Sequence, residues 1–316
     1  MSAGLITIIG GSGYIGRHLT GKLAEKGYRI RLAVRDTEKA AQLMTQGDVG
    51  QVVGVQTNIR NVPSIERAVA GADVVINLVG LLYEAGAQKF DAVHAEGAGN
   101  VAAAAKAAGA SQLIQMSALG ADEKGESAYA RTKAEGEARV KAAYPEATIL
   151  RPSVVWGNDD DFTNKFAQMS AMMPALPLGE GGKNKMQPLW VEDLVDAIVK
   201  IVETPALQGK TYELGGPDAL SMAEIIDVIT SVTERTMFVL PAPYSMMGVM
   251  GFFMGLIPGK PMLTSDQVKL TKADSVVSEG AEGFAELGIE PKPFQAASLE
   301  YLRRFRKGGG LNELHA

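Results

Sequence analysis

A serine, a tyrosine and a lysine are spaced for proton transfer. Ser117 follows an apolar run that ends at Met116, and twelve residues later the chain reads Tyr129-Ala-Arg-Thr-Lys133. A tyrosine and a lysine four residues apart lie one turn apart on one face of a helix. The ammonium group would stabilise the phenolate and so lower the pKa of the tyrosine toward the working range, while the serine holds the same substrate oxygen. We therefore predict Ser117, Tyr129 and Lys133 as catalytic residues.

A glycine-rich segment has the composition of a dinucleotide phosphate site. Directly after the apolar run Leu5–Ile9, the chain reads Gly10-Gly11-Ser12-Gly13-Tyr14-Ile15-Gly16-Arg17. Gly10 permits a tight turn, Gly13 lets a pyrophosphate approach the backbone, and Gly16 lets the next helix pack closely on the strand. The helix N-terminus offers N–H groups and the positive end of the helix dipole to the phosphates. We predict that this segment binds the pyrophosphate of a nicotinamide dinucleotide.

The end of the second predicted strand bears on the choice of cofactor. There the chain reads Leu32-Ala-Val-Arg35-Asp36. An acidic residue at this point would bind the ribose 2′-hydroxyl of NAD, whereas an arginine suits a 2′-phosphate. Because Arg35 has the expected position and Arg17 follows the glycines, we predict NADPH, with NADP(H) preferred over NAD(H). The alternative is that Asp36 binds the ribose and Arg35 points to solvent.

Strands and helices alternate along the first 150 residues. Short apolar runs predict strands over Leu5–Ile9, Arg29–Val34, Gln51–Val55, Asp73–Leu78, Leu113–Met116 and Thr148–Leu150. Longer amphipathic stretches predict helices over Tyr14–Lys26, Thr37–Gln46, Ser64–Ala70, Phe90–Ala108 and Ala128–Ala143. This alternation implies right-handed βαβ units. The expected fold is α/β, a Rossmann-like doubly wound parallel sheet.

The pattern loosens after Pro152. We predict a helix over Leu194–Glu203, a strand over Lys210–Leu214, and a helix over Met222–Thr233 that Ser221 caps. The Gly/Pro-rich stretch Pro174–Lys185 is expected to be a loop. The domains are therefore predicted as an NADP(H)-binding Rossmann domain over residues 1–155 and a smaller C-terminal lobe over residues 156–316, with some elements of the lobe returning to the sheet.

The composition excludes several classes of site and partner. The 316 residues include no cysteine, which excludes thiolate catalysis, zinc–thiolate sites, iron–sulfur clusters and disulfides. The histidines, His18, His94 and His315, have no ligand spacing, so we predict no metal site and expect His94 to be packed or solvated. The three consecutive aspartates Asp159–Asp161 are expected to cap the helix that follows them. A formal net charge of −5 gives no reason to expect nucleic acid as a partner.

One uncharged segment bears on membrane association. Arg235 and Lys260 are separated by 24 residues without a charge, centred on the apolar stretch Tyr244–Ile257. Prolines cut this run to 14 residues, which is too short to span a bilayer. Its methionines and phenylalanines either form an adaptable surface for lipid or a partner, or fill the core of the C-terminal lobe.

These motifs together resemble the short-chain dehydrogenase/reductase superfamily, in its extended or atypical branch. The similarity covers nearly the whole chain and includes Asn58-Ile59, Asn77-Leu78-Val79-Gly80, Arg151-Pro152-Ser153-Val154, Val191–Leu194 and Tyr212–Pro217. The resemblance implies that Lys133 also binds the nicotinamide ribose and that Pro152 and Ser153 lie near the nicotinamide. It places Asn58 and Ile59 near the adenine, where many members carry Asp instead of Asn58, and adds Leu78, Val79 and Gly80 to the cofactor site.

Further blocks resemble a narrower family, the nucleotide-binding accessory subunit of respiratory complex I and its bacterial relatives. The blocks are Gln115–Ala121, Trp156–Phe166, Pro177–Gly179, Gln187–Val191, Leu263–Val268 and Tyr301–Arg306. This resemblance implies a tightly held, structural NADPH. It also implies docking near the membrane, with peripheral-arm subunits of complex I and the membrane surface as partners through Tyr244–Ile257.

Two other functions stay open at the level of sequence. A soluble NADP(H)-dependent oxidoreductase or epimerase would use the Ser-Tyr-Lys triad, and a purely structural subunit does not need Tyr129. A sensor of cofactor occupancy rests only on the two-lobe organisation. Because the N-terminus has no basic segment followed by an apolar one, we expect a cytoplasmic protein, with a peripheral position on the cytoplasmic face of the inner membrane as the second possibility.

Overall fold

The computed structural model describes residues 4–257 and 259–309, and the chain forms two compact units. The first unit contains Met1–Pro152, Glu192–Leu214 and Gly280–Ile289, so two later segments return to the N-terminal part of the chain. The second unit contains Ser153–Val191, Gly215–Glu279 and Glu290–Ala316.

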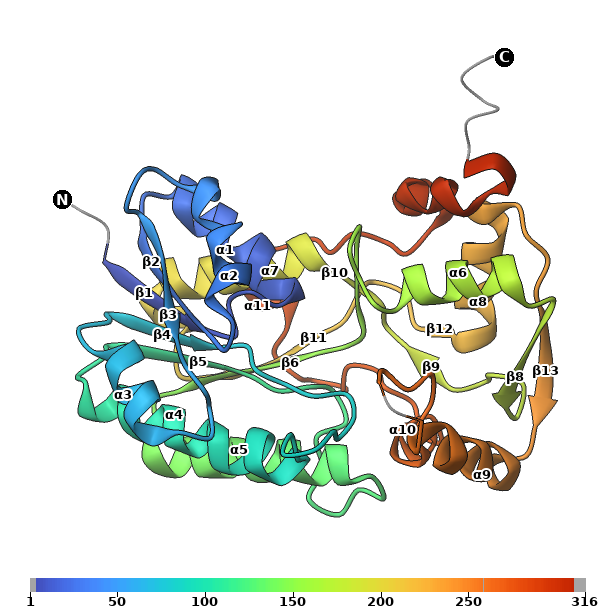
Figure 1. Ribbon diagram of the computed structural model, residues 1–316, viewed down its shortest axis with the longest axis horizontal. Helices are drawn as coiled ribbons and strands as arrows, with labels where there is room; N and C mark the ends of the chain where they lie inside the picture. Colours follow the sequence, from blue (N-terminus) through green and yellow to red (C-terminus); the bar gives the residue numbers. More distant parts are fainter. Residues whose placement is uncertain (1–3, 258, 310–316) are drawn as a thin grey trace. The chain divides into compact units, whose positions relative to one another are not determined.

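A seven-stranded parallel sheet forms the centre of the first unit (Figure 1). Its strands are β1 (Leu5–Ile9), β2 (Arg29–Val34), β3 (Val52–Gln56), β4 (Val74–Asn77), β5 (Gln112–Met116), β6 (Thr148–Pro152) and β11 (Thr211–Leu214). Their order across the sheet is β11-β6-β5-β4-β1-β2-β3, which confirms the predicted Rossmann-like fold. The strands that follow β1 in the chain, β2 and β3, lie on one side of it, and the strands from β4 onward lie on the other side. The boundary between β1 and β4 is therefore the topological switch point, where sheets of this kind bind ligands.

Helices cover both faces of this sheet. On one face lie α1 (Tyr14–Glu25) and α7 (Val191–Glu203), and on the other lie α3 (Val62–Val69), α4 (Glu96–Ala107) and α5 (Ala128–Ala143) (Figure 1). The remaining elements of the unit are short: α2 (Thr37–Ala41), the 3-10 turns η1 (Met44–Gln46) and η3 (Pro205–Leu207), and α11 (Phe284–Leu287). The strands are buried on both faces, since the alternate side chains Ile6, Ile8 and Thr7 are all fully covered.

The predicted helix Phe90–Ala108 is not uniform. Its first part, η2 (Asp91–Ala95), is a π-helix that continues into α4. A π-helical turn adds a residue to the turn and shifts the direction in which its side chains point. Gly136 of α5 lets the two elements approach, because a Cβ there would overlap the carbonyl oxygen of His94.

The second unit is built from short strand pairs and helices. Parallel pairs join β7 (Val155–Trp156) to β10 (Leu189–Trp190) and β8 (Ala175–Gly179) to β13 (Phe238–Ala242), and β9 (Lys185–Met186) pairs antiparallel with β12 (Leu220–Ser221). The helical elements are α6 (Thr163–Met172), α8 (Met222–Thr233), α9 (Tyr244–Gly255), α10 (Ser265–Leu270) and the 3-10 segment η4 (Ala296–Phe305). The expectation of a loop over Pro174–Lys185 is wrong at β8, whose strand forms by pairing with a segment some sixty residues later.

Local capping explains two of these helices. Ser221 and Glu224 form a capping box at the start of α8, as predicted for Ser221. Asp160 is buried, and its carboxylate accepts hydrogen bonds from the N–H groups of Phe162 and Asn164 at 2.8 and 3.1 Å in the first turn of α6. The hydroxyl of Tyr301 lies 2.8 Å from that of Thr163, which ties η4 to the same turn.

The apolar stretch Tyr244–Ile257 contains α9 and the two residues that follow it, and it is divided between core and surface. Met247 and Gly251 are buried, and a Cβ at Gly251 would press on the backbone of Thr264 and Ser265. The opposite face is exposed and consists of Met246, Val249, Phe252, Phe253, Leu256 and Ile257. Within residues 4–257 and 259–309, the helices are all too short or too polar to cross a bilayer.

Candidate nucleotide site and its proton-transfer residues

The glycine-rich turn lies at the switch point of the sheet. Gly10 follows β1 with a φ of +83°, and its N–H donates to the carbonyl of Ala33 on β2 at 2.8 Å. The turn closes when the N–H of Gly13 donates to the carbonyl of Gly10 at 3.0 Å. Because β4 ends beside β1, a Cβ at Gly10 would lie 2.9 Å from Val79. Only glycine suits this position, because its φ is positive and its neighbour is close.

The other glycines keep the turn against the sheet and the helix. A Cβ at Gly16 would lie 2.7 Å from the carbonyl carbon of Gly11 and overlap its oxygen, so α1 starts in direct contact with the turn. A Cβ at Gly11 would lie 2.7 Å from Leu32. By contrast, the exposed Gly13 meets only the oxygen of Gly10, at 3.2 Å. The open side of the turn is therefore at Gly13, where the sequence predicts the pyrophosphate.

The N-terminus of α1 suits an anion. Gly13 is its N-cap residue, so no side chain caps the first turn, and that turn contains no acidic residue. Four N–H groups at a helix start have no partner within the helix, and the helix dipole adds a partial positive charge there. Among the predicted residues, Ser12, Tyr14, Ile15 and Arg17 all lie on this turn or in the first turn of α1. The arrangement fits the pyrophosphate of a dinucleotide.

A basic pocket lies at the ends of β2 and β3. It has a volume of about 300 Å³ and is lined by Arg35, Gln56, Thr57, Asn58, Arg60, Asn61, Ser64, Arg67 and Gln88. Within the described part of the chain, no carboxylate forms an ion pair with Arg35, Arg60 or Arg67. The Asp36 carboxylate instead accepts from the N–H of Glu38 at 3.0 Å and so caps α2. The sequence singled out Arg35 but missed Arg60 and Arg67, which the turn after β3 and helix α3 bring to the same place.

Asn58 and Ile59 have different environments. Asn58 lines the basic pocket, and its side-chain oxygen accepts from the N–H of Arg60 at 3.1 Å. Ile59 is buried and belongs to the core between the sheet and α4, where a Cβ at Gly97 would lie 2.9 Å from it. Asn58 is thus placed to contact a ligand, whereas the side chain of Ile59 packs in the protein interior.

Ser117 and Lys133 are both buried beside the end of β5. The N–H of Ser117 donates to the carbonyl of Leu150 at 2.7 Å, but its hydroxyl has no hydrogen-bond partner in the described chain. The ammonium group of Lys133 donates to the carbonyl of Met116 at 3.3 Å, one residue before Ser117. A buried hydroxyl without a partner is costly. The position of the Ser117 hydroxyl therefore fits a site in which an oxygen atom of a ligand would form the missing hydrogen bond.

Burial changes the pKa values of this group. It raises the pKa of the Tyr129 phenol to about 12. It also lowers the pKa of the Lys133 ammonium to about 8, while nearby Glu137 opposes that change. The ammonium lies 5.8 Å from the centre of the Tyr129 ring. The predicted lowering of the tyrosine pKa is wrong, because burial raises this pKa, and the phenol stays protonated at neutral pH.

His94 belongs to the same cluster, a position near the site that the sequence allowed but favoured less than a merely packed or solvated histidine. It is buried, as expected for a packed histidine. Its ring stacks on Phe90 at 5.2 Å between centroids and meets the Tyr129 ring edge-on at 5.3 Å. Burial, and next the charge of Lys133, lower the pKa of His94 to about 3. The π-helix η2 sets its direction, and no sequence pattern marks that turn.

The remaining predicted residues follow the ends of β4 and β6. Leu78, Val79 and Gly80 follow β4, and the side chain of Asn77 accepts from the N–H of Val79 at 3.2 Å. A Cβ at Gly80 would lie 3.3 Å from the Lys133 ammonium, so the backbone after β4 passes close to that charge. Pro152 ends β6, and its carbonyl accepts from the N–H of Leu119 at 2.9 Å. Ser153 belongs to the second unit, where its hydroxyl accepts from the N–H of Gln187 at 3.3 Å.

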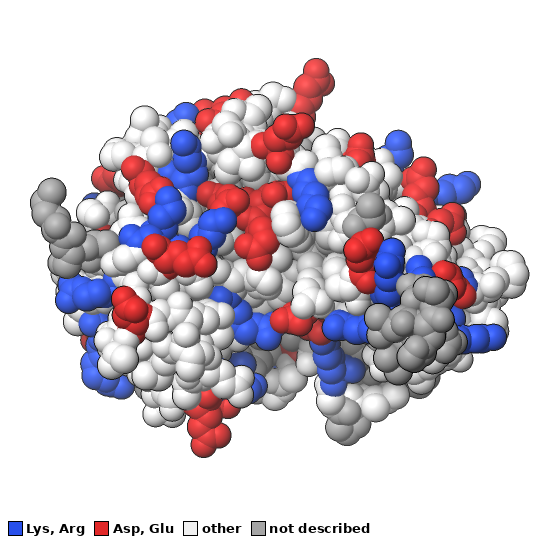
Figure 2. Space-filling model, turned by 90° about the horizontal axis from the view of Figure 1, so that it is seen from above, with Lys and Arg blue, Asp and Glu red and all other residues white. Residues whose placement is uncertain are grey.

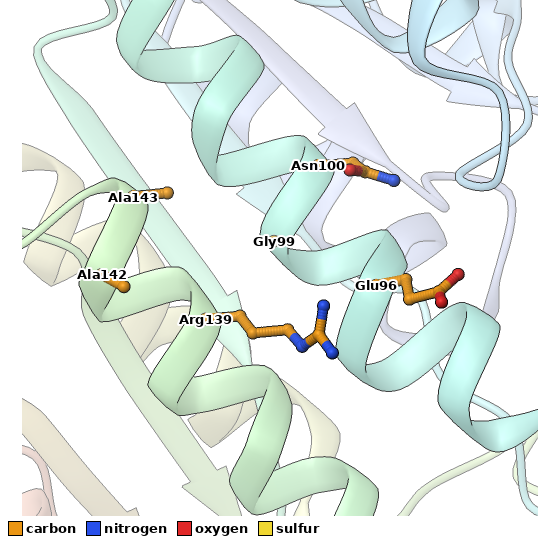
Figure 3. A pocket seen from close by; sticks show the side chains of 6 residues that line it. All are labelled: Glu96, Gly99, Asn100, Arg139, Ala142 and Ala143. Atoms are coloured by element: carbon orange, nitrogen blue, oxygen red, sulfur yellow. The ribbon is translucent and has the colours of Figure 1, made fainter.

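A larger hollow of about 590 Å³ lies away from this cluster (Figure 3). It is lined by Glu96, Gly99, Asn100, Arg139, Ala142 and Ala143, from the outer faces of α4 and α5. Figure 3 shows Arg139 extending from α5 toward α4. Because Arg139 is ten residues beyond Tyr129, the hollow lies about 15 Å farther along α5. It has no direct link to the proton-transfer residues.

The comparisons with known proteins fit this geometry. A family model described as NAD(P)H-binding matches residues 10–203. The chain belongs to this NAD(P)H-binding family. A mouse relative is 32% identical over 307 residues, covering 97% of this chain and 81% of its own length, and is named NADH dehydrogenase [ubiquinone] 1 alpha subcomplex subunit 9, mitochondrial. The matched range begins at Gly10, so it includes the glycine-rich turn.

A relative with another name and a solved structure are also similar to this chain. A ceramide reductase of Caulobacter vibrioides is 34% identical over 204 residues, covering 65% of this chain and 62% of the reductase. The Citrobacter sp. triphenylmethane reductase, solved as a complex with NADP(H), matches the fold with a TM-score of 0.71 at 17% identity, covering 95% of this chain and 99% of that structure. The chain therefore shares the fold of this reductase over nearly its whole length.

Proposed function

We propose that this protein is an NADPH-holding accessory subunit of an NADH:quinone oxidoreductase, and that it docks near the membrane with peripheral-arm subunits. The observation that carries the proposal is the similarity to the mouse subunit over 97% of this chain, which includes the second unit as well as the nucleotide-binding one. A protein that shared only the nucleotide site would match over the first unit alone.

The predicted preference for NADPH is supported by the basic pocket. Arg35, Arg60 and Arg67 line one pocket, and Asp36 is engaged as a helix cap. Guanidinium groups bind phosphate with directed, charge-assisted hydrogen bonds, whereas the ribose hydroxyl of NAD needs an acceptor. These three residues would hold the 2′-phosphate, and the turn at Gly13 would hold the pyrophosphate.

Calorimetry of NADPH and NADH binding tests this preference. Arg35→Ala or Arg67→Ala should weaken NADPH binding by about ten- to a hundredfold and leave NADH binding nearly unchanged, because a charge-assisted hydrogen bond is lost. Arg29→Ala is the matched control, since Arg29 is an exposed arginine at the opposite end of the same strand. If these variants weakened the binding of NADPH and NADH equally, the pocket would not be the cause of the preference for NADPH.

Docking near the membrane is supported by the exposed face of α9. Phe252, Phe253, Leu256 and Ile257 are 57–65% exposed, and α9 contains no charged residue. A contiguous apolar surface of this kind is typical of an interaction site. The inner face of the helix is already packed through Met247 and Gly251, so the outer residues are not needed for the core.

Fractionation of detergent-solubilised membranes tests the docking. The chain should migrate with NADH:quinone reductase activity, and the double variant Phe252→Ser/Phe253→Ser should be released from that fraction while it still binds NADPH. Met172→Ser is the control, because Met172 is 75% exposed on α6 of the same unit. Recovery of the wild-type chain only as a free monomer would contradict the proposal, including the proposed peripheral position at the cytoplasmic face of the inner membrane.

A second candidate is a free-standing NADP(H)-dependent oxidoreductase or epimerase. It is favoured by the unpartnered hydroxyl of buried Ser117 and by the protonated state of Tyr129, which suits donation of a proton to a carbonyl oxygen during reduction. Bound NADPH would supply the hydride. Substrate-dependent NADPH oxidation that is lost in Tyr129→Phe, with unchanged NADPH affinity, would favour this candidate over the structural role.

A further inference from the structure

His94 makes two directed hydrogen bonds from inside the protein. Its Nε2 accepts from the N–H of Leu81 at 2.8 Å, in the segment that follows β4. Its Nδ1 lies 3.2 Å from the hydroxyl of Thr132 on α5. That hydroxyl donates to the carbonyl of Ala128 at 2.8 Å, so it can accept the proton of Nδ1. A single neutral tautomer of the imidazole satisfies both contacts.

The segments that these bonds join carry the groups of the nucleotide site. Gly80, directly before Leu81, faces both the Lys133 ammonium and Nε2 of His94, at 3.3 and 3.9 Å from its ideal Cβ position. Thr132 lies between Tyr129 and Lys133 on α5. The His94 ring also packs edge-on against the Tyr129 ring, 5.3 Å between centroids. The imidazole therefore contacts the turn after β4 on one side and the helix of the proton-transfer residues on the other.

We propose that His94 is a positioning residue that ties the turn after β4 to α5 and so sets Tyr129 and Lys133 relative to the nicotinamide end of the nucleotide. The inference rests on the proposed NADPH site. A protonated ring would present an N–H to the N–H of Leu81 and a second positive charge to Lys133, so the tie requires a neutral imidazole. Its lowered pKa agrees with this requirement.

The test compares two ligands by calorimetry, NADPH and adenosine 2′,5′-bisphosphate, which lacks the nicotinamide half. His94→Phe keeps the ring stacking but removes both hydrogen bonds. It should weaken NADPH binding about tenfold and leave the affinity for the bisphosphate unchanged. His94→Gln, whose amide oxygen can accept from Leu81, should recover most of the NADPH affinity. Bound NADPH should also show a lower fluorescence anisotropy in His94→Phe, because its nicotinamide is less ordered.

Thr132→Val gives a second route to the same result. It removes the partner of Nδ1 with little change of shape and should lower NADPH affinity in the same selective way, so it decides the matter if His94→Phe does not fold. Equal losses for both ligands, or unchanged affinity in every variant, would overturn the positioning role. If the wild-type chain itself fails to bind NADPH, the proposed function fails instead, so the two failures are distinguishable.

Discussion

Replacement of Lys133 by methionine should stabilise the nucleotide-free protein at neutral pH. Lys133 is 6% exposed, and burial lowers its pKa from 10.5 to about 8. A difference of about 2.5 pKa units corresponds to about 3 kcal/mol, by which the folded state is destabilised when the lysine is charged. Methionine has a similar length and no charge. Part of the gain is offset because the carbonyl of Met116 loses a hydrogen bond, so we expect a net stabilisation of about 2 kcal/mol at pH 7.

The size of the effect changes with pH in a defined window. Below pH 8 the lysine is charged in both states, and the folded protein bears the full cost of burying the charge. Between about pH 8 and 10.5 the unfolded chain binds more protons than the folded one, so the stability of the wild type rises with pH. The advantage of Lys133→Met should therefore shrink across this window and vanish near pH 10.5.

Urea denaturation followed by far-UV circular dichroism measures this difference. Both tryptophans, Trp156 and Trp190, lie in the second unit, so their fluorescence reports that unit separately and should not respond to the variant. Taking the difference between the variant and the wild type at each pH cancels the titration of the groups that do not interact with Lys133.

Two results would refute the reasoning. A variant that is less stable than the wild type at pH 7 would mean that Lys133 is not destabilising in its buried position. A stability difference that stays constant from pH 7 to 10.5 would mean that its pKa is not lowered. We also expect the variant to lose NADPH affinity, since a residue that is buried at a cost to stability is typical of a binding or catalytic site.

Two further substitutions test other parts of the structure. Gly16→Ala forces a methyl group against the backbone of Gly11 and should destabilise the first unit by about 1–3 kcal/mol and lower NADPH affinity more than tenfold, measured by urea denaturation and calorimetry. Its control is Gly21→Ala on the same helix, where the nearest atom is 3.8 Å away, and equal effects of both would contradict the packing argument. Tyr301→Phe removes the hydroxyl that contacts Thr163 and should destabilise the second unit by about 1 kcal/mol by tryptophan fluorescence; a change in NADPH affinity would be unexpected.

The sequence predicted the first unit closely because its signals are local. β1 and β2 have the predicted bounds, and α5 begins and ends at the predicted residues. Each of these elements combines an apolar period with a turn or cap residue at its ends. The strand β8 carries no such signal, since its partner β13 lies far along the chain and its own Pro177 argues against a strand.

In the candidate site, too, the features that lie within one segment were predicted, and those that depend on the fold were not. The glycine-rich turn and the Tyr-x-x-x-Lys spacing are properties of one segment, so the sequence contains them. The grouping of Arg35 with Arg60 and Arg67 depends on how the ends of two strands and a helix come together. The direction of the Tyr129 pKa depends on burial, which spacing along a helix does not show. The predicted lowering considered only the neighbouring charge and therefore had the wrong sign for the nucleotide-free protein.

The charge distribution predicts that nucleotide binding and attachment through α9 depend differently on salt. On the face that Figure 2 shows, acidic and basic side chains are interspersed over the described residues, so a general electrostatic attraction to polyanions is not expected. Positive charge is instead concentrated where a single phosphate group would be held, at Arg35, Arg60 and Arg67. The exposed face of α9 has no charge at all, so any contact there must come from apolar burial. Nucleotide binding should therefore weaken with salt, while attachment through α9 should persist at high salt and fail in detergent.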